Sequence, residues 1–152
     1  MKIRTGTPDD IPFLLQLERD STTAAHWTLQ QYTDLFQDGA GARRLVLLVE
    51  REGVPLGFLV AHHIASEWEL ENIVVSSTER RKGFGAHLMC ALMDTARESC
   101  SESIFLEVRE SNYPAQRFYE KTGFRQAGVR KGYYRDSPEN AILYRLEVRK
   151  LM

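Results

Sequence analysis

The chain of 152 residues suits one domain, whereas two full domains would be cramped in this length. Hydrophobic residues make up 43% and charged residues 27% of it, a mixture typical of a globular protein with a buried core and unlike that of a disordered chain. The 20 Lys and Arg residues balance 21 Asp and Glu residues, and the net charge of −1 excludes a generic nucleic-acid coat protein and a polybasic membrane binder.

No stretch approaches the roughly 20 apolar residues that span a bilayer, and the first ten residues lack the apolar core of a signal peptide. We therefore expect a cytoplasmic protein that binds neither a membrane nor nucleic acid directly. Its two cysteines, Cys90 and Cys100, are too few for a disulfide scaffold, and without a CxxC or clustered His/Cys pattern we expect no metal site. Cys90 falls inside a helical pattern, which predicts a buried, inert thiol.

Strand and helix patterns alternate along the chain without an internal repeat or a linker. Thr7 and Pro8 are typical of a helix start, and Thr28 is typical of the N-cap of a second, short helix. The expected elements are a strand at 2–4, helices at 8–21 and from 29, strands at 45–50, 56–64 and 68–75, a helix at 83–97, a strand at 104–109, a helix at 113–121, and strands at 124–131 and 141–149. This order predicts a single α/β domain over residues 1–152, in which one mixed, mostly antiparallel sheet carries helices on both faces.

The most informative segment is the turn that joins a strand ending at Val75 to a helix beginning near Gly83. Glycines let the backbone approach a ligand closely, and the N–H groups and dipole of a helix N-terminus favour an anion. The basic run at 80–82 adds positive charge, so the turn predicts a phosphate or pyrophosphate site. It is not a Walker A loop, and Leu88 stands where a dinucleotide fingerprint has its third glycine. An ordinary basic loop that caps a helix is the alternative.

The pattern Arg80-x-x-Gly83-x-Gly85 resembles the pyrophosphate-binding turn of the GCN5-related N-acetyltransferases, the GNAT superfamily, which cradle coenzyme A. A second segment, residues 106–124, resembles the later motif of this family: a strand, an Asn, and a helix that carries an aromatic pair and ends in Gly-Phe. Within the superfamily the chain is most similar to the bacterial ribosomal-protein alanine N-acetyltransferases of the RimI type. It departs from them at His26-Trp27, where that family often has Pro-Trp.

The resemblance implies acetyl-CoA as the cofactor. It implies that the backbone of residues 73–75 pairs with the pantetheine amide and offers an N–H to the thioester oxygen. Asn112 would bind the pantetheine arm, and it is also placed to cap the helix that follows it. The cofactor-binding residues implied are Ile73, Val74, Val75, Arg80, Arg81, Lys82, Gly83, Phe84, Gly85, Ala86, Asn112 and Tyr119.

Amine acetylation needs an unprotonated amine and a proton for the leaving thiolate. Near neutral pH about a tenth of an α-amine is unprotonated, against under ~0.1% of a lysine amine. One carboxylate base therefore suffices for an N-terminal amine. The resemblance implies Glu107 as this base, acting directly or through water, and Tyr119 as the proton donor. The alternatives are a salt bridge from Glu107 to Arg109 and a buried helix aromatic at Tyr119.

An acidic stripe is predicted on the strand that leads to the glycine turn. Glu67, Glu69 and Glu71 alternate, so strand periodicity puts them on one face, where they could receive a basic peptide; a solvated polar edge is the alternative. The resemblance also implies an acceptor loop at Trp27 and a wall of two tyrosines, for which cross-strand packing is the alternative. The substrate-binding residues expected are Trp27, Glu69, Glu71, Asn72, Tyr133 and Tyr134.

These observations predict an acetyl-CoA-dependent N-terminal protein acetyltransferase that acts by direct transfer on the N-terminal alanine of a ribosomal protein. Acetylation of a small-molecule amine or of a lysine on the same fold is the close alternative. A non-catalytic acyl-CoA-binding module is an alternative of another class. The joint presence of Glu107 and Tyr119 argues against such a module, since binding alone needs neither.

Overall fold

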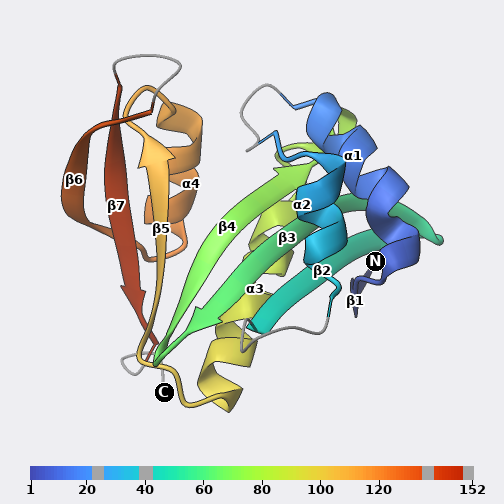
Figure 1. The fold of residues 1–152 in the computed structure, drawn as a ribbon, viewed down its shortest axis with the longest axis horizontal. Helices are drawn as coiled ribbons and strands as arrows, with labels where there is room; N and C mark the ends of the chain where they lie inside the picture. Colours follow the sequence, from blue (N-terminus) through green and yellow to red (C-terminus); the bar gives the residue numbers. More distant parts are fainter. Residues whose placement is uncertain (22–25, 38–42, 135–138, 149–152) are drawn as a thin grey trace.

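The computed structural model of the chain describes residues 1–21, 26–37, 43–134 and 139–148. Seven strands form one sheet in the order β1-β2-β3-β4-β5-β7-β6 (Figure 1). The strands are β1 (Lys2–Thr5), β2 (Arg43–Arg51), β3 (Val54–Ile64), β4 (Glu67–Val75), β5 (Ser103–Arg109), β6 (Arg125–Tyr134) and β7 (Glu139–Glu147). All neighbours pair antiparallel except β4 and β5, which are parallel, so the predicted mixed, mostly antiparallel sheet is confirmed.

Four α-helices and two 3₁₀ turns connect the described strands. They are η1 (Pro8–Asp10), α1 (Ile11–Arg19), α2 (Leu29–Asp34), η2 (Ser77–Glu79), α3 (Phe84–Glu98) and α4 (Tyr113–Lys121). The helix predicted from Pro8 begins as a 3₁₀ turn: the Pro8 carbonyl accepts the N–H of Ile11, because Pro12 has no N–H to donate to it. The Asp10 carboxylate caps this turn by accepting the Thr7 N–H at 2.8 Å. The Thr28 cap is confirmed, since its hydroxyl accepts the Gln31 N–H at 3.2 Å. Residue 149, the predicted end of the last strand, lies outside the described residues.

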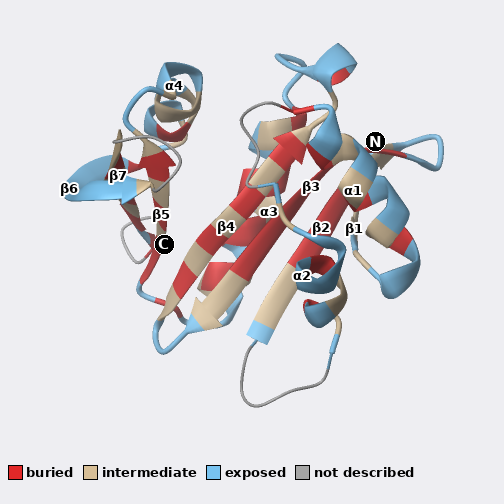
Figure 2. Cartoon of the chain, turned by 45° about the horizontal axis from the view of Figure 1, so that its top comes forward, coloured by how far each residue is buried: buried red, intermediate tan, exposed pale blue. Residues whose placement is uncertain are grey.

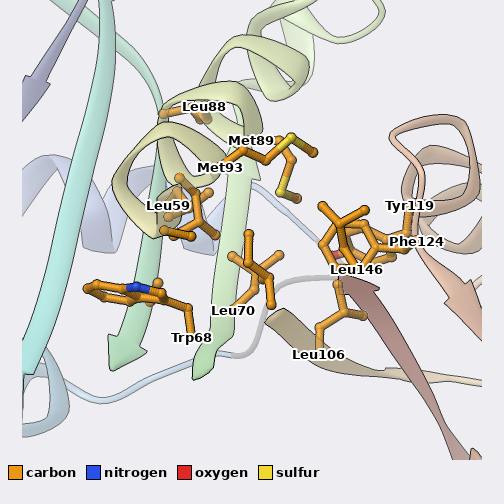
Figure 3. Close-up of a cluster of buried hydrophobic side chains, with 14 of the residues drawn as sticks. Leu59, Trp68, Leu70, Leu88, Met89, Met93, Leu106, Tyr119, Phe124 and Leu146 are labelled. Carbon is orange, nitrogen blue, oxygen red and sulfur yellow. The ribbon is translucent and has the colours of Figure 1, made fainter. Parts of the chain in front are cut away.

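The two faces of the sheet carry separate hydrophobic clusters, as predicted for helices on both faces (Figures 1 and 2). α1 and α2 cover one face of β2–β4, which we call the α1/α2 face, and α3 covers the other. Figure 3 shows Leu88, Met89 and Met93 of α3 over Leu59 and Leu70, with Tyr119 and Phe124 at the far side of the same cluster. Each fully buried side chain of this size stabilises the fold by about 1.5–3 kcal/mol.

The predicted burial of Cys90 is wrong: this thiol is exposed. The buried residues of α3 are Phe84, Leu88, Met89, Leu92, Met93 and Ala96. Cys90 lies two residues after Leu88, about 200° around the helix from it, so it falls outside the apolar stripe. Leu88, Leu92 and Ala96, which recur at helical spacing, are all fully buried.

β4 and β5 pair over a short length and then separate (Figure 1). Their register contains three residue pairs, from Glu67 with Ser103 to Glu69 with Phe105. A β-bulge follows at once in β4, because Val60 of β3 opposes Asn72 while its neighbour Ala61 opposes Leu70, which leaves Glu71 as the extra residue. A bulge bends its strand and increases the local twist. The second half of β4 therefore has an edge without a strand partner among the described residues.

Candidate active site

The glycine turn ends at the N-terminus of α3. Gly83 has φ +88, a left-handed conformation that favours glycine, and a Cβ there would meet no atom within 4 Å. The N–H of His87 donates to the Gly83 carbonyl at 3.0 Å and closes the first turn. The N–H groups before it have no acceptor within the helix and point out of its end, which is suited to an anion. Gly85 is different: a Cβ there would stand 3.4 Å from Phe118, in ordinary van der Waals contact, so the packing of α3 against α4 does not by itself require a glycine.

The basic run beside this turn is less uniform than its sequence indicates. Lys82 forms an ion pair of 3.0 Å with Glu79, which also pairs with Arg51 at 2.8 Å. Lys82 and then Arg51 hold the pKa of Glu79 below its ordinary value. Arg80 and Arg81 are exposed, and neither forms an ion pair within the described part of the chain. The positive charge available to an anion is therefore centred on Arg80 and Arg81.

The other residues implied for the cofactor surround the same corner. Val74 is buried, while Ile73 and Val75 pack partly against the cluster under α3. Phe84 is buried under the Arg51 guanidinium, so only its backbone can face a phosphate, whereas Ala86 is exposed. The helix cap predicted at residue 112 is confirmed, because Asn112 Oδ1 accepts the Ala115 N–H at 3.3 Å.

Glu107 lies in the middle of β5, on the face opposite the buried side chains of Ile104, Leu106 and Val108. Its Oε1 is 3.1 Å from the Arg130 guanidinium, while its Oε2 is buried without a hydrogen-bond partner among the described residues. A pocket of about 250 Å³ opens beside it, lined by Glu107, Gly128, Val129, Arg130, Ala141 and Leu143. A carboxylate oxygen next to a pocket is suited to accept a proton from a bound molecule.

The alternative partner considered for Glu107 is wrong. Arg109 pairs instead with Glu139 at 3.2 Å, and its guanidinium lies 3.9 Å from the centre of the Tyr134 ring. Tyr133 makes the matching contact with Arg130 at 4.7 Å, and the two tyrosine rings meet edge to face at 5.1 Å. The tyrosine pair is thus fixed by stacked arginines beside Glu107.

The Tyr119 ring belongs to the core of α4, 5.5 Å from Phe118 and 5.8 Å from Phe124 between ring centres. Its hydroxyl makes no hydrogen bond to any described residue. Burial, and to a lesser extent Tyr134, raises the pKa of Tyr119. The hydroxyl therefore stays protonated throughout the physiological range and keeps a proton that it can donate.

The three glutamates of the acidic stripe share one face of the sheet, as predicted, and this is the α1/α2 face. They differ in their partners. Glu67 is occupied by Arg145 and Ser103 of the neighbouring strands. Glu71 Oε1 lies 2.8 Å from Arg44 Nε, an ion pair that lacks hydrogen-bond alignment. Burial, and then the charge of Glu107, raises the pKa of Glu69, and burial raises that of Glu71. Among the three, Glu69 is the glutamate whose pKa is raised by the negative charge of Glu107.

Asn72 and Trp27 both hydrogen-bond to Glu18 between the α1/α2 face and its helices. Asn72 is 6% exposed and donates to Glu18 Oε1 at 3.2 Å and to the Tyr32 hydroxyl at 3.4 Å. The N–H of Trp27 donates to the same Glu18 oxygen at 2.9 Å, and its ring lies 5.5 Å from that of Tyr32. Sequence reasoning missed Glu18, although a glutamate four residues after Leu14 on the apolar stripe of α1 was the signal that could have revealed it.

A model of the Acetyltransferase (GNAT) family matches residues 11–124. This chain is a GNAT-family N-acetyltransferase. A [ribosomal protein bS18]-alanine N-acetyltransferase of Haemophilus ducreyi is 31% identical over 147 residues, which cover 95% of this chain and 98% of the relative. The namesake from Escherichia coli K12 is 32% identical over 74% of this chain and 78% of the relative.

Solved structures agree with this GNAT assignment. The ribosomal-protein-S18-alanine N-acetyltransferase from Escherichia coli superimposes with a TM-score of 0.81 at 27% identity, covering 97% of this chain and 93% of that one. Ard1 from Thermoplasma volcanium gives a TM-score of 0.84 at 30% identity and covers 96% of both chains. The GNAT fold predicted from the sequence is confirmed.

GNAT acetyltransferases use acetyl-CoA, and the residues present fit this ligand. The open N-terminus of α3 with Arg80 and Arg81 offers donors to a pyrophosphate. The unpaired edge of Ile73–Val75 offers a strand to an extended amide chain. No helix of the described part is long and apolar enough to cross a membrane, and no three His, Cys, Asp or Glu residues there are grouped to hold a metal ion.

Proposed function

We propose that this GNAT enzyme, as a single domain of residues 1–152, acetylates the N-terminal alanine of ribosomal protein bS18. The observation that carries the proposal is the similarity to the Haemophilus ducreyi enzyme of that name over nearly the whole of both chains. The match includes both halves of the sheet, and therefore the segments on either side of Glu107 that would hold a peptide. An acceptor of this kind also agrees with the acidic residues on the α1/α2 face.

Glu107 is proposed as the general base. Its Oε2 has no hydrogen-bond partner among the described residues, and a small movement of this buried atom toward the adjoining pocket would bring it to an amine or to a water between them. Arg130 forms an exposed ion pair with Oε1 and leaves Oε2 without a partner among the described residues. Because an α-amine has a pKa near 8 and is partly unprotonated at neutral pH, a carboxylate of ordinary basicity is sufficient to take the remaining proton.

Tyr119 is proposed as the donor to the leaving sulfur. Acetyl-CoA supplies the acetyl group as an activated thioester, whose departing thiol resembles that of cysteine with a pKa near 8.5. Since burial raises the pKa of Tyr119 above its ordinary value, complete transfer in advance would be uphill. Tyr119 would therefore donate a hydrogen bond to the sulfur as negative charge develops there, and a proton passed to the departing thiolate would be returned to the tyrosine from water.

The remaining residues are divided between binding acetyl-CoA and binding the acceptor. Arg80 and Arg81, with the backbone N–H groups of residues 83–86, bind the pyrophosphate, and Lys82 contributes less because Glu79 neutralises it. The backbone of Ile73–Val75 and the side chain of Asn112 hold the pantetheine arm. On the acceptor side we propose substrate contacts from Glu69, Glu71 and the tyrosines at 133 and 134, and a loop formed around Trp27 and Asn72.

A panel of acceptors tests the proposal. The protein is incubated with acetyl-CoA and peptides that begin with the bS18 sequence, the same peptides blocked at the N-terminus, lysine peptides and polyamines, and products are identified by mass spectrometry. We expect one acetyl group on the α-amine of the alanine peptide and none on its blocked form. Acetylation confined to polyamines or lysine would refute the acceptor, and tight acetyl-CoA binding without any product would indicate a binding module.

A further inference from the structure

A buried carboxylate under the acceptor side of the enzyme has no part in the chemistry described so far. Glu18 of α1 is 3% exposed, and its side chain lies between α2 and β4. Oε1 accepts the Trp27 N–H at 2.9 Å and the Asn72 amide at 3.2 Å. The Tyr32 hydroxyl also hydrogen-bonds to Glu18, and burial, followed by this contact, raises the pKa of that tyrosine.

Burying a carboxylate is costly unless hydrogen-bond donors surround it. Here the donors come from three separate segments: Trp27 precedes α2, Tyr32 lies within α2, and Asn72 lies in β4. Trp27 and α2 are thus tied to the sheet through a single side chain. An apolar residue at position 18 would fill the same space and leave the Trp27 N–H and the Asn72 amide without this acceptor.

The hydrogen bonds of Glu18 lie between the proposed acceptor side and the proposed cofactor strand. Asn72 directly follows the bulge residue Glu71 and directly precedes Ile73, where the proposed pantetheine edge begins. Trp27, the other donor to Glu18 Oε1, packs its ring against Tyr32. Glu18 therefore contacts both the segment proposed to face the acceptor and the strand proposed to face the cofactor.

We propose that Glu18 is a positioning residue that fixes Trp27 against β4 and thereby sets the affinity of the enzyme for its peptide acceptor. This inference rests on the proposed function, in which the segment at Trp27 contacts the peptide. Without Glu18 the segment populates other positions, and the apparent affinity for the peptide falls by the fraction of molecules that remain correctly placed. The pyrophosphate site on α3 makes no contact with Glu18, and the backbone of Ile73–Val75 is held by its own pairing with β3, so acetyl-CoA binding should change far less than peptide binding.

Glu18→Ala is the direct test, with steady-state kinetics measured separately for peptide and acetyl-CoA. Losing hydrogen bonds to a charged group predicts a rise in the peptide KM of about tenfold or more. We expect kcat and the Kd of acetyl-CoA to change far less. Glu18→Gln keeps the side-chain volume and one acceptor oxygen but loses the charge, so it should raise the peptide KM by less than Glu18→Ala does, and this smaller rise is the test should the alanine variant not fold.

Asp10→Ala is the matched control. Asp10 is also buried, and it accepts a backbone N–H from Thr7 and a guanidinium from Arg4, but none of its partners lies near Trp27. It should lower thermal stability without raising the peptide KM. An unchanged peptide KM in the folded Glu18 variants, or an equal rise in Asp10→Ala, would overturn the proposal.

A second readout does not depend on activity. The chain has two tryptophans, so Trp68→Phe leaves Trp27 as the only one. In that background Glu18→Ala should shift the emission of Trp27 to longer wavelength and increase its quenching by acrylamide, and Asp10→Ala should not. Unchanged emission and quenching would refute the positioning role. Failure of every peptide in the acceptor panel would instead refute the proposed function, while the fluorescence still decides the role of Glu18.

Discussion

Glu107→Gln should separate catalysis from stability. The substitution keeps the size of the side chain and removes its charge. It therefore has two effects at once: it breaks the 3.1 Å ion pair with Arg130, and it removes the proposed base. Arg130→Gln breaks the same ion pair and leaves the carboxylate in place. The difference between the two variants therefore isolates the contribution of Glu107 as a base.

The magnitudes differ enough to decide the question. The Arg130 side chain is 59% exposed and that of Glu107 is 23% exposed. Solvent screens such a pair, which typically contributes only about 0.2–1 kcal/mol. For a chain of this length the loss lowers Tm by at most about 4 °C. A general base contributes about 10²–10⁴-fold to the rate, which corresponds to about 3–5 kcal/mol of activation free energy.

The assay is kcat at saturating acetyl-CoA and peptide, followed by release of the coenzyme A thiol, with Tm measured on the same samples. Glu107→Gln should lose kcat by at least about 100-fold. Arg130→Gln should show the same small change in Tm and keep most of its kcat. If Arg130→Gln loses as much activity as Glu107→Gln, the ion pair rather than the base explains the defect, and the reasoning fails.

Three further predictions address the other proposed roles. Tyr119→Phe leaves the core ring in place and removes the hydroxyl, so kcat should fall about tenfold or more while the Kd of acetyl-CoA by calorimetry is unchanged; a normal kcat would remove Tyr119 from the mechanism. Arg80→Ala with Arg81→Ala should raise the Kd of acetyl-CoA about tenfold or more, and Lys82→Ala should raise it less; the reverse order would contradict the part assigned to Glu79. Burial and Glu107 raise the pKa of Glu69 in the folded state, so the folded state holds that proton more tightly and its stability falls as pH rises through this pKa. Glu69→Gln should therefore increase Tm at neutral pH, and this gain should vanish below about pH 4, where ordinary carboxyl groups are protonated. The same substitution should raise the peptide KM. A lower Tm at neutral pH would contradict the prediction.

The sequence predicts the elements well where periodicity and end signals agree. Thr28 and Asn112 each cap the helix that was expected to follow, and the alternating strand at 104–109 places Glu107 opposite its buried neighbours. These features depend on residues close together in the chain. Helix and strand patterns report on such local geometry directly.

The partners of charged residues could not be predicted because they depend on distant strands. Arg130 is far from Glu107 in sequence and meets it only across β7, which lies between β5 and β6 in the sheet. Arg44 reaches Glu71 across β3 in the same way. Cys90 was misplaced for a different reason: a helical pattern establishes a helix, and only the phase of its apolar stripe establishes which side is buried.

The bulge at Glu71 is the feature that joins these observations. Strict alternation from Glu67 would place Ile73 on the same face as the three glutamates, yet Ile73 packs against the cluster under α3, and Asn72 points toward Glu18. One extra residue thus switches the faces of β4 between its acidic half and its apolar half. The acidic half can then face an acceptor while the apolar half seals the core below α3. The bend also explains why β4 leaves β5 after Glu69, because a strand that twists there cannot keep a parallel register with a straight neighbour. The separation of the two strands, which the proposed acetyl-CoA site requires, therefore follows from the same residue that divides the faces.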